Sequence, residues 1–297
     1  MMTPHLKSWL LALRPKTLTA AIVPIAVATA LVKAEGREIQ WWISVAALLS
    51  SVFIQIATNL LNDAIDFEKG ADTDTRTGPR RLTQSGLVSK RQVMIGGFLS
   101  LGVALALGIP LVIEGGWPIV VIGLVSMFLA YGYTGGPFPL AYLGLGDLFV
   151  ILFFGLIAVG GTYFLHTHTI NGPVIVAGLQ VGFLATVLIA INNLRDSPQD
   201  KLVGKKTLAV RFGPLFSRVE IAFLAYSPFL LGVYYGNLGW QWAGYAPLIL
   251  VPLAGHIVRG LWKTEPGPMM NRYLGLAAAL QLAFGLALSV GLWMGRS

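Results

Sequence analysis

The chain has 297 residues, of which 55% are hydrophobic and only 11% are charged. A soluble globular domain is usually about 45–50% apolar and about 25% charged, so this composition excludes an ordinary soluble fold and favours a membrane protein. The net charge of +8 would suggest nucleic-acid binding in a soluble protein. An excess of Lys and Arg is also typical of cytoplasmic loops in membrane proteins, and we expect no nucleic-acid partner. The chain has no cysteine, which excludes disulfides, thiolate nucleophiles and Cys-ligated metals.

Nine stretches of the sequence are apolar enough to predict helices that cross a membrane. The hydrocarbon core of a bilayer is about 30 Å thick, and a helix needs about 20 apolar residues to cross it. We therefore expect an all-α, polytopic membrane protein, a nine-helix transmembrane bundle formed by a single domain that covers residues 1–297. In chain order the predicted spans are 17–33, 41–62, 92–113, 117–134, 147–165, 173–194, 218–236, 242–262 and 272–294.

The distribution of basic residues predicts the orientation of these spans. Of the 21 Lys and Arg residues, all but Lys33, Arg37 and Arg296 lie before the first span or in the connections between spans two and three, six and seven, and eight and nine. Basic residues gather on the cytoplasmic side of a membrane protein. We expect a multi-pass protein of the bacterial cytoplasmic (inner) membrane, with its N-terminus and these loops in the cytoplasm and its C-terminus outside.

A first charged cluster directly follows the second predicted span. The stretch "NDAIDFEKGADTDTRTGPRR", residues 62–81, holds five acids and four bases. Asn59, Asp63 and Asp66 are spaced i, i+4 and i+7, so they lie on one face if the helix continues. Acids at the end of a membrane helix are costly unless they are paired or bind a metal. The cluster therefore predicts a functional site, with a solvated loop of internal ion pairs as the alternative.

A second, similar cluster follows the sixth predicted span. In "INNLRDSPQDKLVGKKTLAVRFG", residues 191–213, the spacing of Asn192, Asp196 and Asp200 is i, i+4 and i+8. These three also lie on one helix face, although Pro198 can disturb it. Because the two clusters occupy corresponding places, we predict a two-fold internal repeat whose two polar faces oppose each other across a cavity.

Together the clusters have the composition of a metal–polyphosphate site. Carboxylate and amide oxygens select Mg²⁺ or Ca²⁺ rather than Zn²⁺. Magnesium is typically held by one or two carboxylates plus the phosphates of a substrate. The interleaved bases Arg76, Arg81, Lys205 and Lys206 can bind the phosphate oxygens that the metal leaves free.

The motifs resemble those of the UbiA superfamily of intramembrane prenyltransferases. "NDAID" and "DSPQD" resemble its paired N-D-x-x-D and D-x-x-x-D motifs, and "RTGPRRLTQSG" and "NNLRDSPQDKLVGKKTLAVRFG" are similar to its MenA branch, the 1,4-dihydroxy-2-naphthoate polyprenyltransferases. The resemblance covers ordered pieces from Arg14 to Gly213. The wider superfamily often has an acid four residues after Asp66, where this chain has Gly70. That departure counts against the branches that act on 4-hydroxybenzoate or make haem.

The resemblance implies a Mg²⁺-dependent aromatic polyprenyltransferase of menaquinone biosynthesis. Its substrates would be a polyprenyl diphosphate and 1,4-dihydroxy-2-naphthoate, and its products demethylmenaquinone, diphosphate and CO₂. The implied catalytic residues are Asp63, Asp66, Asp196 and Asp200, and the implied metal ligands are these four with Asn59 and Asn192. The implied diphosphate-binding residues are Lys16, Arg76, Arg81, Lys205 and Lys206, and the implied substrate pocket comprises Asn62, Tyr131, Tyr133, Tyr142 and Asn193.

Other interpretations of these features remain open at this level. Within the superfamily, the acceptor can be another aromatic acid such as 4-hydroxybenzoate or homogentisate. A transporter of cations or phosphate compounds is an alternative of another class, but transporters bind near the middle of the membrane, whereas these charges gather at one face. The tyrosines of the pocket can shelter an allylic cation or belong to an interfacial aromatic belt. Asp147 is either a helix cap or a polar wall of the acceptor site. The sequence predicts a lipid bilayer as surroundings, but neither the prenyl chain length nor the oligomeric state.

Overall fold

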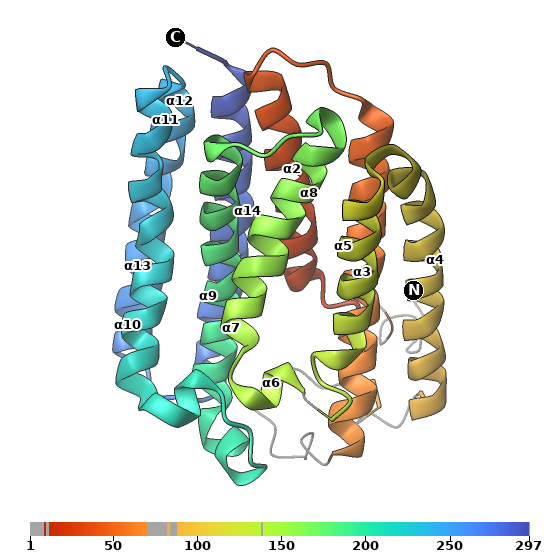
Figure 1. Ribbon diagram of the computed structural model, residues 1–297. Helices are drawn as coiled ribbons and strands as arrows, with labels where there is room; N and C mark the ends of the chain where they lie inside the picture. Colours follow the sequence, from red (N-terminus) through yellow and green to blue (C-terminus); the bar gives the residue numbers. More distant parts are fainter. Residues whose placement is uncertain (1–8, 10–11, 70–81, 84–87, 138, 297) are drawn as a thin grey trace, which may run out of the picture.

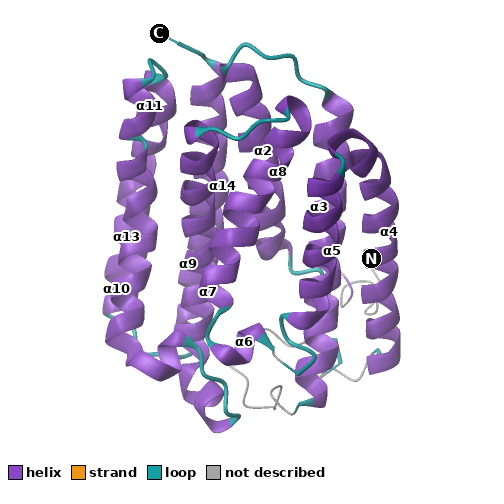
Figure 2. Cartoon of the chain, in the orientation of Figure 1, coloured by secondary structure: helices purple, strands orange, loops and turns teal. Residues whose placement is uncertain are grey.

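The computed structural model describes residues 9, 12–69, 82–83, 88–137 and 139–296, which form a bundle of long helices (Figures 1 and 2). No strand occurs within these ranges. The all-α fold class is therefore confirmed. The elements are α2 (Pro15–Ala34), α3 (Trp41–Glu68), α4 (Lys90–Gly115), α5 (Trp117–Gly132), α6 (Leu140–Leu143), α7 (Gly146–Val150), η1 (Ile151–Ile157), α8 (Ala158–Thr167), α9 (Gly172–Leu202), α10 (Leu208–Leu231), α11 (Val233–Asn237), α12 (Gln241–Tyr245), η2 (Ala246–Leu250), α13 (Val251–Trp262), η3 (Pro268–Met270) and α14 (Asn271–Trp293).

Among the described residues, eight helical segments are long and apolar enough to cross a membrane, so the predicted count of nine is wrong by one. The exception is the predicted span 117–134, which forms α5. This helix has only 16 residues, or about 24 Å at 1.5 Å per residue. It begins at Trp117 as predicted, directly after the reversal at Gly116, but it ends at Gly132, and turns and bends follow at residues 133–137. The helix still runs antiparallel to α4 and returns the chain to the other end of the bundle (Figure 1).

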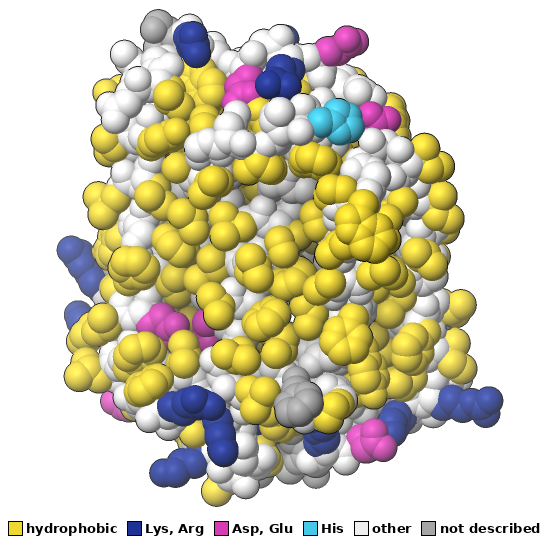
Figure 3. Space-filling model, in the orientation of Figure 1, with side chains coloured by type: hydrophobic (Ala, Val, Ile, Leu, Met, Phe, Trp, Pro, Cys, Tyr) yellow, Lys and Arg dark blue, Asp and Glu magenta, His cyan; other side chains and the backbone are white. Residues whose placement is uncertain are grey.

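The largest hydrophobic cluster surrounds α9. Leu184 and Ile191 of this helix share the cluster with Val27 of α2, Ile221 of α10 and Phe284 of α14. Lipid tails are as apolar as these side chains, so close packing rather than exclusion of water holds such helices together. The outer surface is also hydrophobic, and Figure 3 shows apolar side chains across the middle of one face, with charged side chains toward its two ends and along its left edge. The packing fixes α9, which carries the second charged cluster at its C-terminal end.

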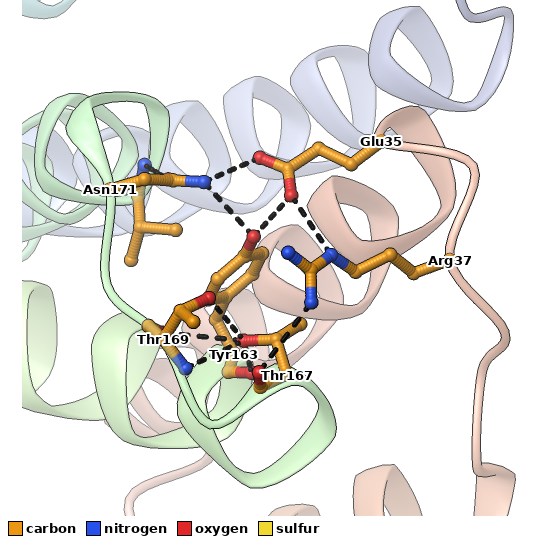
Figure 4. Close-up of polar contacts among 7 residues, drawn as sticks. Glu35, Arg37, Tyr163, Thr167, Thr169 and Asn171 are labelled. Atoms are coloured by element: carbon orange, nitrogen blue, oxygen red, sulfur yellow. Dashed lines mark hydrogen bonds and ion pairs between the residues drawn. The ribbon is translucent and has the colours of Figure 1, made fainter.

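A polar cluster joins α8, the start of α9 and the residues after α2 at one end of the bundle (Figures 1 and 4). The hydroxyl of Tyr163 donates a hydrogen bond to Glu35. The amide of Asn171 donates to Glu35 Oε1 at 2.7 Å and to the Tyr163 hydroxyl at 3.0 Å, and Arg37 Nε lies 3.5 Å from Glu35 Oε2. A partly buried carboxylate is tolerated when it has such partners. These contacts tie the helices together at the end opposite the charged clusters.

We expect Gly155→Ala to destabilise the bundle because η1 packs directly against α9 at this position. A Cβ on Gly155 would lie 2.3 Å from the carbonyl oxygen of Gly178 and 2.7 Å from Cα of Gly182. Backbone atoms cannot move aside cheaply, so the overpacking costs about 1–3 kcal/mol, which lowers the melting temperature in detergent by about 2–6 °C. Gly102→Ala is the matched control, since nothing lies within 4 Å of its Cβ position. Equal melting temperatures for the two variants would show that η1 and α9 are not in contact as described.

Candidate active site

The two charged clusters meet at one end of the bundle, where α3 and α9 both end (Figure 1). The side chain of Lys205, in the connection after α9, lies between them. Its Nζ is 3.9 Å from Asp66 Oδ1 and 3.6 Å from Asp200 Oδ1. Both aspartates are buried, with exposed fractions of 4% and 9%. Two acids more than 130 positions apart therefore share one cation, which is the opposition of clusters that the sequence pattern predicts.

The short helix α6 closes over this pair of acids. The hydroxyl of Tyr142 donates a hydrogen bond to Asp66 Oδ1 at 3.2 Å. Lys69 Nζ and Lys205 Nζ lie 4.4 Å and 5.0 Å from the centre of the Tyr142 ring, so both ammonium groups face its π-electrons. Main-chain bonding holds α6 in place, because the Lys206 amide donates to the Tyr142 carbonyl at 3.0 Å. Tyr142 thus contacts Asp66 and lies beside Lys69 and Lys205.

The other two predicted catalytic acids have different surroundings. Asp63 accepts hydrogen bonds from the amide of Leu82 at 2.9 Å, from the amide of Thr83 at 3.3 Å and from the Thr83 hydroxyl. It therefore fixes the point at which the chain returns from residues 70–81. Asp196 forms a two-pronged ion pair with Arg195, with nitrogen–oxygen distances of 2.8 Å and 2.6 Å. Similar spacing in the sequence thus does not give the four acids equal surroundings in this structure.

Three of the predicted asparagines have defined partners. Asn59 donates to the carbonyl of Leu13 and to the hydroxyl of Thr17, both at 3.0 Å, while its Oδ1 accepts from Gln55 at 3.3 Å. Asn62 Oδ1 accepts from the Thr134 hydroxyl at 2.6 Å. Asn193 Nδ2 donates to Asp147 Oδ2 at 3.4 Å. Asn192 lies partly buried on α9.

In this structure Asn59 therefore braces α3 against the start of α2. Its assignment as a metal ligand stays a prediction, as does that of Asn192.

The predicted phosphate-binding residues are only partly within the described chain. Arg76 and Arg81 lie outside it, and Lys16 lies in the first turn of α2 with a side chain that is also outside it. Lys205 lies between the two acids, whereas Lys206 contributes its main chain to α6.

Sequence reasoning missed two basic residues at the site. Lys69 donates to the Thr134 carbonyl at 2.7 Å, and Arg195 is 3% exposed and also donates to Asn271 of α14 at 2.7 Å. Each lies within three residues of an acid of its motif, and this proximity in the sequence could have indicated them.

An apolar chamber of about 450 Å³ lies between α2, α3, α4, α5, α7, η1 and α8. Its walls are almost entirely hydrophobic, with Phe149 and Phe153 among them. Gln55 and Thr58 of α3 also line the chamber. Gln55 lies about one turn before Asn59 and Thr58 directly before it, so the chamber begins next to the first charged cluster. Tyr133 lines the same chamber, whereas Tyr131 is exposed. The site thus combines a charged end with an apolar interior.

The donor set at the charged end fits Mg²⁺. Within the described residues no group of three or more His, Asp or Glu side chains converges closely enough to hold a metal by itself. Mg²⁺ does not require such a group, since it keeps several waters and is usually bound by one or two carboxylates plus substrate phosphates. Asp66 and Asp200 supply hard oxygen ligands around a position where the ammonium group of Lys205 is already stabilised.

An all-helical membrane bundle with two acid clusters beside an apolar chamber defines an intramembrane enzyme for substrates with a polyanionic head and an apolar tail. Residues 21–279 match the model of the UbiA prenyltransferase family, and the chain belongs to this family. It is 32% identical to a 1,4-dihydroxy-2-naphthoate octaprenyltransferase of Haemophilus influenzae, with 98% of each chain covered. It is also 32% identical to a protein of the same name from Escherichia coli, with 97% of this chain and 96% of the relative covered.

Solved structures of the family share the fold. The apo structure of a UbiA homolog from Aeropyrum pernix K1 has a TM-score of 0.71 at 14% identity, and covers 92% of this chain and 97% of its own. A UbiA homolog from Archaeoglobus fulgidus bound to GPP and Mg²⁺ has a TM-score of 0.62 at 18% identity, with coverage of 95% and 99%. At these identities the likeness concerns the fold, which agrees with the all-α bundle predicted from the sequence.

Proposed function

We propose that the chain transfers a polyprenyl group from a polyprenyl diphosphate to 1,4-dihydroxy-2-naphthoate, in the pathway to menaquinone. The two bacterial relatives named above carry this activity in their names and align with nearly the whole chain. The observation that carries the proposal is the meeting of Asp66 and Asp200 at Lys205, next to an apolar chamber. That arrangement suits a diphosphate head at the charged end and a prenyl tail among the helices.

In this reaction the allylic carbon loses its bond to a diphosphate oxygen and gains a bond to a ring carbon of the acceptor. The allylic C–O bond breaks, and its electron pair leaves with the diphosphate. A ring carbon of the electron-rich acceptor forms a bond to the allylic carbon. When that ring carbon bears the carboxylate, the electron pair of its bond to CO₂ returns to the ring as CO₂ leaves. The immediate product is a prenylated quinol, whose oxidised form is demethylmenaquinone.

The residues of the site divide these tasks. Asp66 and Asp200 would hold Mg²⁺, which when bound supplies positive charge beside the leaving diphosphate. The ammonium group of Lys205 attracts the phosphate oxygens. The apolar chamber keeps water from the allylic carbon, and the ring of Tyr142 faces two ammonium groups and is placed to face a developing carbocation in the same way. The side chains of Arg76, Arg81 and Lys16 remain proposed contacts of the diphosphate.

We expect a panel of aromatic acids to identify the acceptor. Membranes that contain the chain, supplied with labelled polyprenyl diphosphate, should give a prenylated lipid with 1,4-dihydroxy-2-naphthoate. With 4-hydroxybenzoate or homogentisate we expect a rate lower by at least about a hundredfold, since the site must hold the correct ring in the geometry of attack. Membranes without the chain are the control. A faster reaction with either monocyclic acid would assign the chain to a different branch of the family.

We also propose that the charged site faces the cytoplasm of a bacterial cell and that the C-terminus lies outside. The distribution of Lys and Arg supports this orientation. A topology reporter fused after Lys201 should therefore read cytoplasmic, and one fused after Ser297 should read external. In Figure 1 the C-terminus lies at the end of the bundle away from the end of α9. If both reporters read on the same side, the helices between them do not cross the membrane as the fold requires.

A further inference from the structure

Asp147 is a buried carboxylate that the mechanism above does not use. It lies in the first turn of α7, but the N-cap of that helix is Leu145, so Asp147 is not the cap residue that its position in the sequence first suggested. Asp147 is only 5% exposed, and its Oδ1 has no hydrogen-bond partner within the described part of the chain. Oδ2 has one long bond, from Asn193 at 3.4 Å. A buried carboxylate with so few partners is costly, and a ligand that donates a hydrogen bond would remove that cost.

The position of Asp147 relates it to the reaction site through Tyr133. A Cβ on Gly146 would lie 2.8 Å from the Tyr133 hydroxyl, so this hydroxyl packs against the backbone beside Asp147. Desolvation raises the pKa of Tyr133, and the negative charges of Asp147, Asp66 and Asp200 raise it further. Three carboxylates from α3, α7 and α9 are thus close to a single phenol that also lines the apolar chamber. Asp147 thus lies in the same region of the bundle as the two acids at Lys205.

The charges around Asp147 select the chemistry of its ligand. Glu220 of α10 is close enough for its negative charge to act together with that of Asp147. No Lys or Arg forms an ion pair with either acid in the described part of the chain. An anionic group such as a diphosphate or a carboxylate would therefore be repelled here, whereas a neutral hydroxyl can donate to Oδ1. Of the two substrates, only the aromatic acceptor carries such a hydroxyl.

We propose that Asp147, oriented by Asn193, accepts a hydrogen bond from a ring hydroxyl of the aromatic acceptor and so forms the acceptor subsite. This inference rests on the proposed function. In 1,4-dihydroxy-2-naphthoate the hydroxyl at position 1 is next to the carboxylate and bonds to it internally, which leaves the hydroxyl at position 4 as the free donor. A hydrogen bond from this hydroxyl to a carboxylate would fix the orientation of the ring in the site. The same contact turns the acceptor carboxylate away from Asp147 and toward the basic side of the site, where Lys69 and Lys205 lie.

The test compares two acceptors with wild type and Asp147→Asn. In wild type, 1-hydroxy-4-methoxy-2-naphthoate should be a poorer acceptor than 1,4-dihydroxy-2-naphthoate by about ten- to a hundredfold in kcat/KM, because it lacks the donor for a charge-assisted hydrogen bond. In Asp147→Asn the two acceptors should differ by less than about threefold. The KM of the polyprenyl diphosphate should change less than about twofold in the variant, since Asp147 is not placed at the diphosphate. The variant Glu220→Gln is the matched control and should keep the preference for the dihydroxy acid.

The possible failures are distinguishable. Absence of turnover with 1,4-dihydroxy-2-naphthoate in wild type would remove the proposed function itself. If the wild type turns over and Asp147→Asn still prefers the dihydroxy acid to the methoxy analogue as strongly, the acceptor subsite is wrong and the proposed function stands. If Asp147→Asn does not fold, Asn193→Ala supplies the answer, because loss of its bond to Asp147 should raise the KM of the dihydroxy acid by about threefold or more and leave the KM of the methoxy analogue unchanged. Equal changes for both acceptors in Asn193→Ala would assign a structural role to the pair and overturn the subsite.

Discussion

Asp66→Asn should lower the rate of prenyl transfer by about a hundredfold or more, because it removes negative charge from the position where the two clusters meet. Asp66 is 4% exposed, and its Oδ1 accepts from the Tyr142 hydroxyl and lies 3.9 Å from Lys205 Nζ. The amide of Asn keeps the shape of the side chain but is a weak metal ligand and leaves the charge of Lys205 less balanced. Asp200→Asn should have a similar effect, since Asp200 lies 3.6 Å from the same ammonium group.

Glu68 provides the matched control for Asp66 on the same helix. It lies two residues further along α3, has a side chain 62% exposed and pairs with Lys90 at 2.7 Å. An exposed ion pair contributes little, so Glu68→Gln should change the rate by less than about twofold. The measurement is the initial rate of labelled-lipid formation, with each variant normalised to the amount of folded chain in the membrane. Equal losses in Asp66→Asn and Glu68→Gln would mean that the general charge of the loop, rather than the meeting point of the clusters, supports activity.

Removal of Mg²⁺ should abolish turnover of the wild-type chain. The carboxylates of Asp66 and Asp200 bring two negative charges toward the place where a diphosphate, itself a polyanion, would bind, and Lys205 supplies one positive charge between them. We therefore expect divalent cations to be needed for the head group to bind and leave. We expect chelation with EDTA to lower the rate by at least about a hundredfold and excess Mg²⁺ to restore it. Full activity in EDTA would show that the acids serve the fold or the acceptor instead of a metal.

The sequence predicted the positions of the helices better than their lengths. Apolar runs of sufficient length identify membrane helices because lipid leaves few alternatives for the backbone. The helix α5 ends instead at Gly132, and turns and bends follow at residues 133–137. A hydropathy pattern does not show where the chain leaves the helix, so it predicts a span that extends to residue 134.

The sequence predicts which acids share a helix face, but not which residue each acid contacts. The spacing of Asp63 and Asp66 places both on one face of α3, yet Asp63 binds the returning chain at Leu82 and Thr83 while Asp66 meets the other cluster. These partners come from loops, whose paths depend on tertiary contacts and not on helical periodicity. The same holds for Asp147, whose missing partner is visible only once its surroundings are known.

We propose that this chain joins a prenyl carbon to an aromatic carbon with release of diphosphate and CO₂. The most direct measurement uses the purified chain in lipid vesicles, with polyprenyl diphosphate labelled in its prenyl carbons and 1,4-dihydroxy-2-naphthoate labelled in its carboxylate carbon. We expect equal amounts of prenylated lipid, diphosphate and labelled CO₂, and none of the three when either substrate is left out. Release of diphosphate without the acceptor, or a prenylated product that keeps the carboxylate label, would contradict the claim.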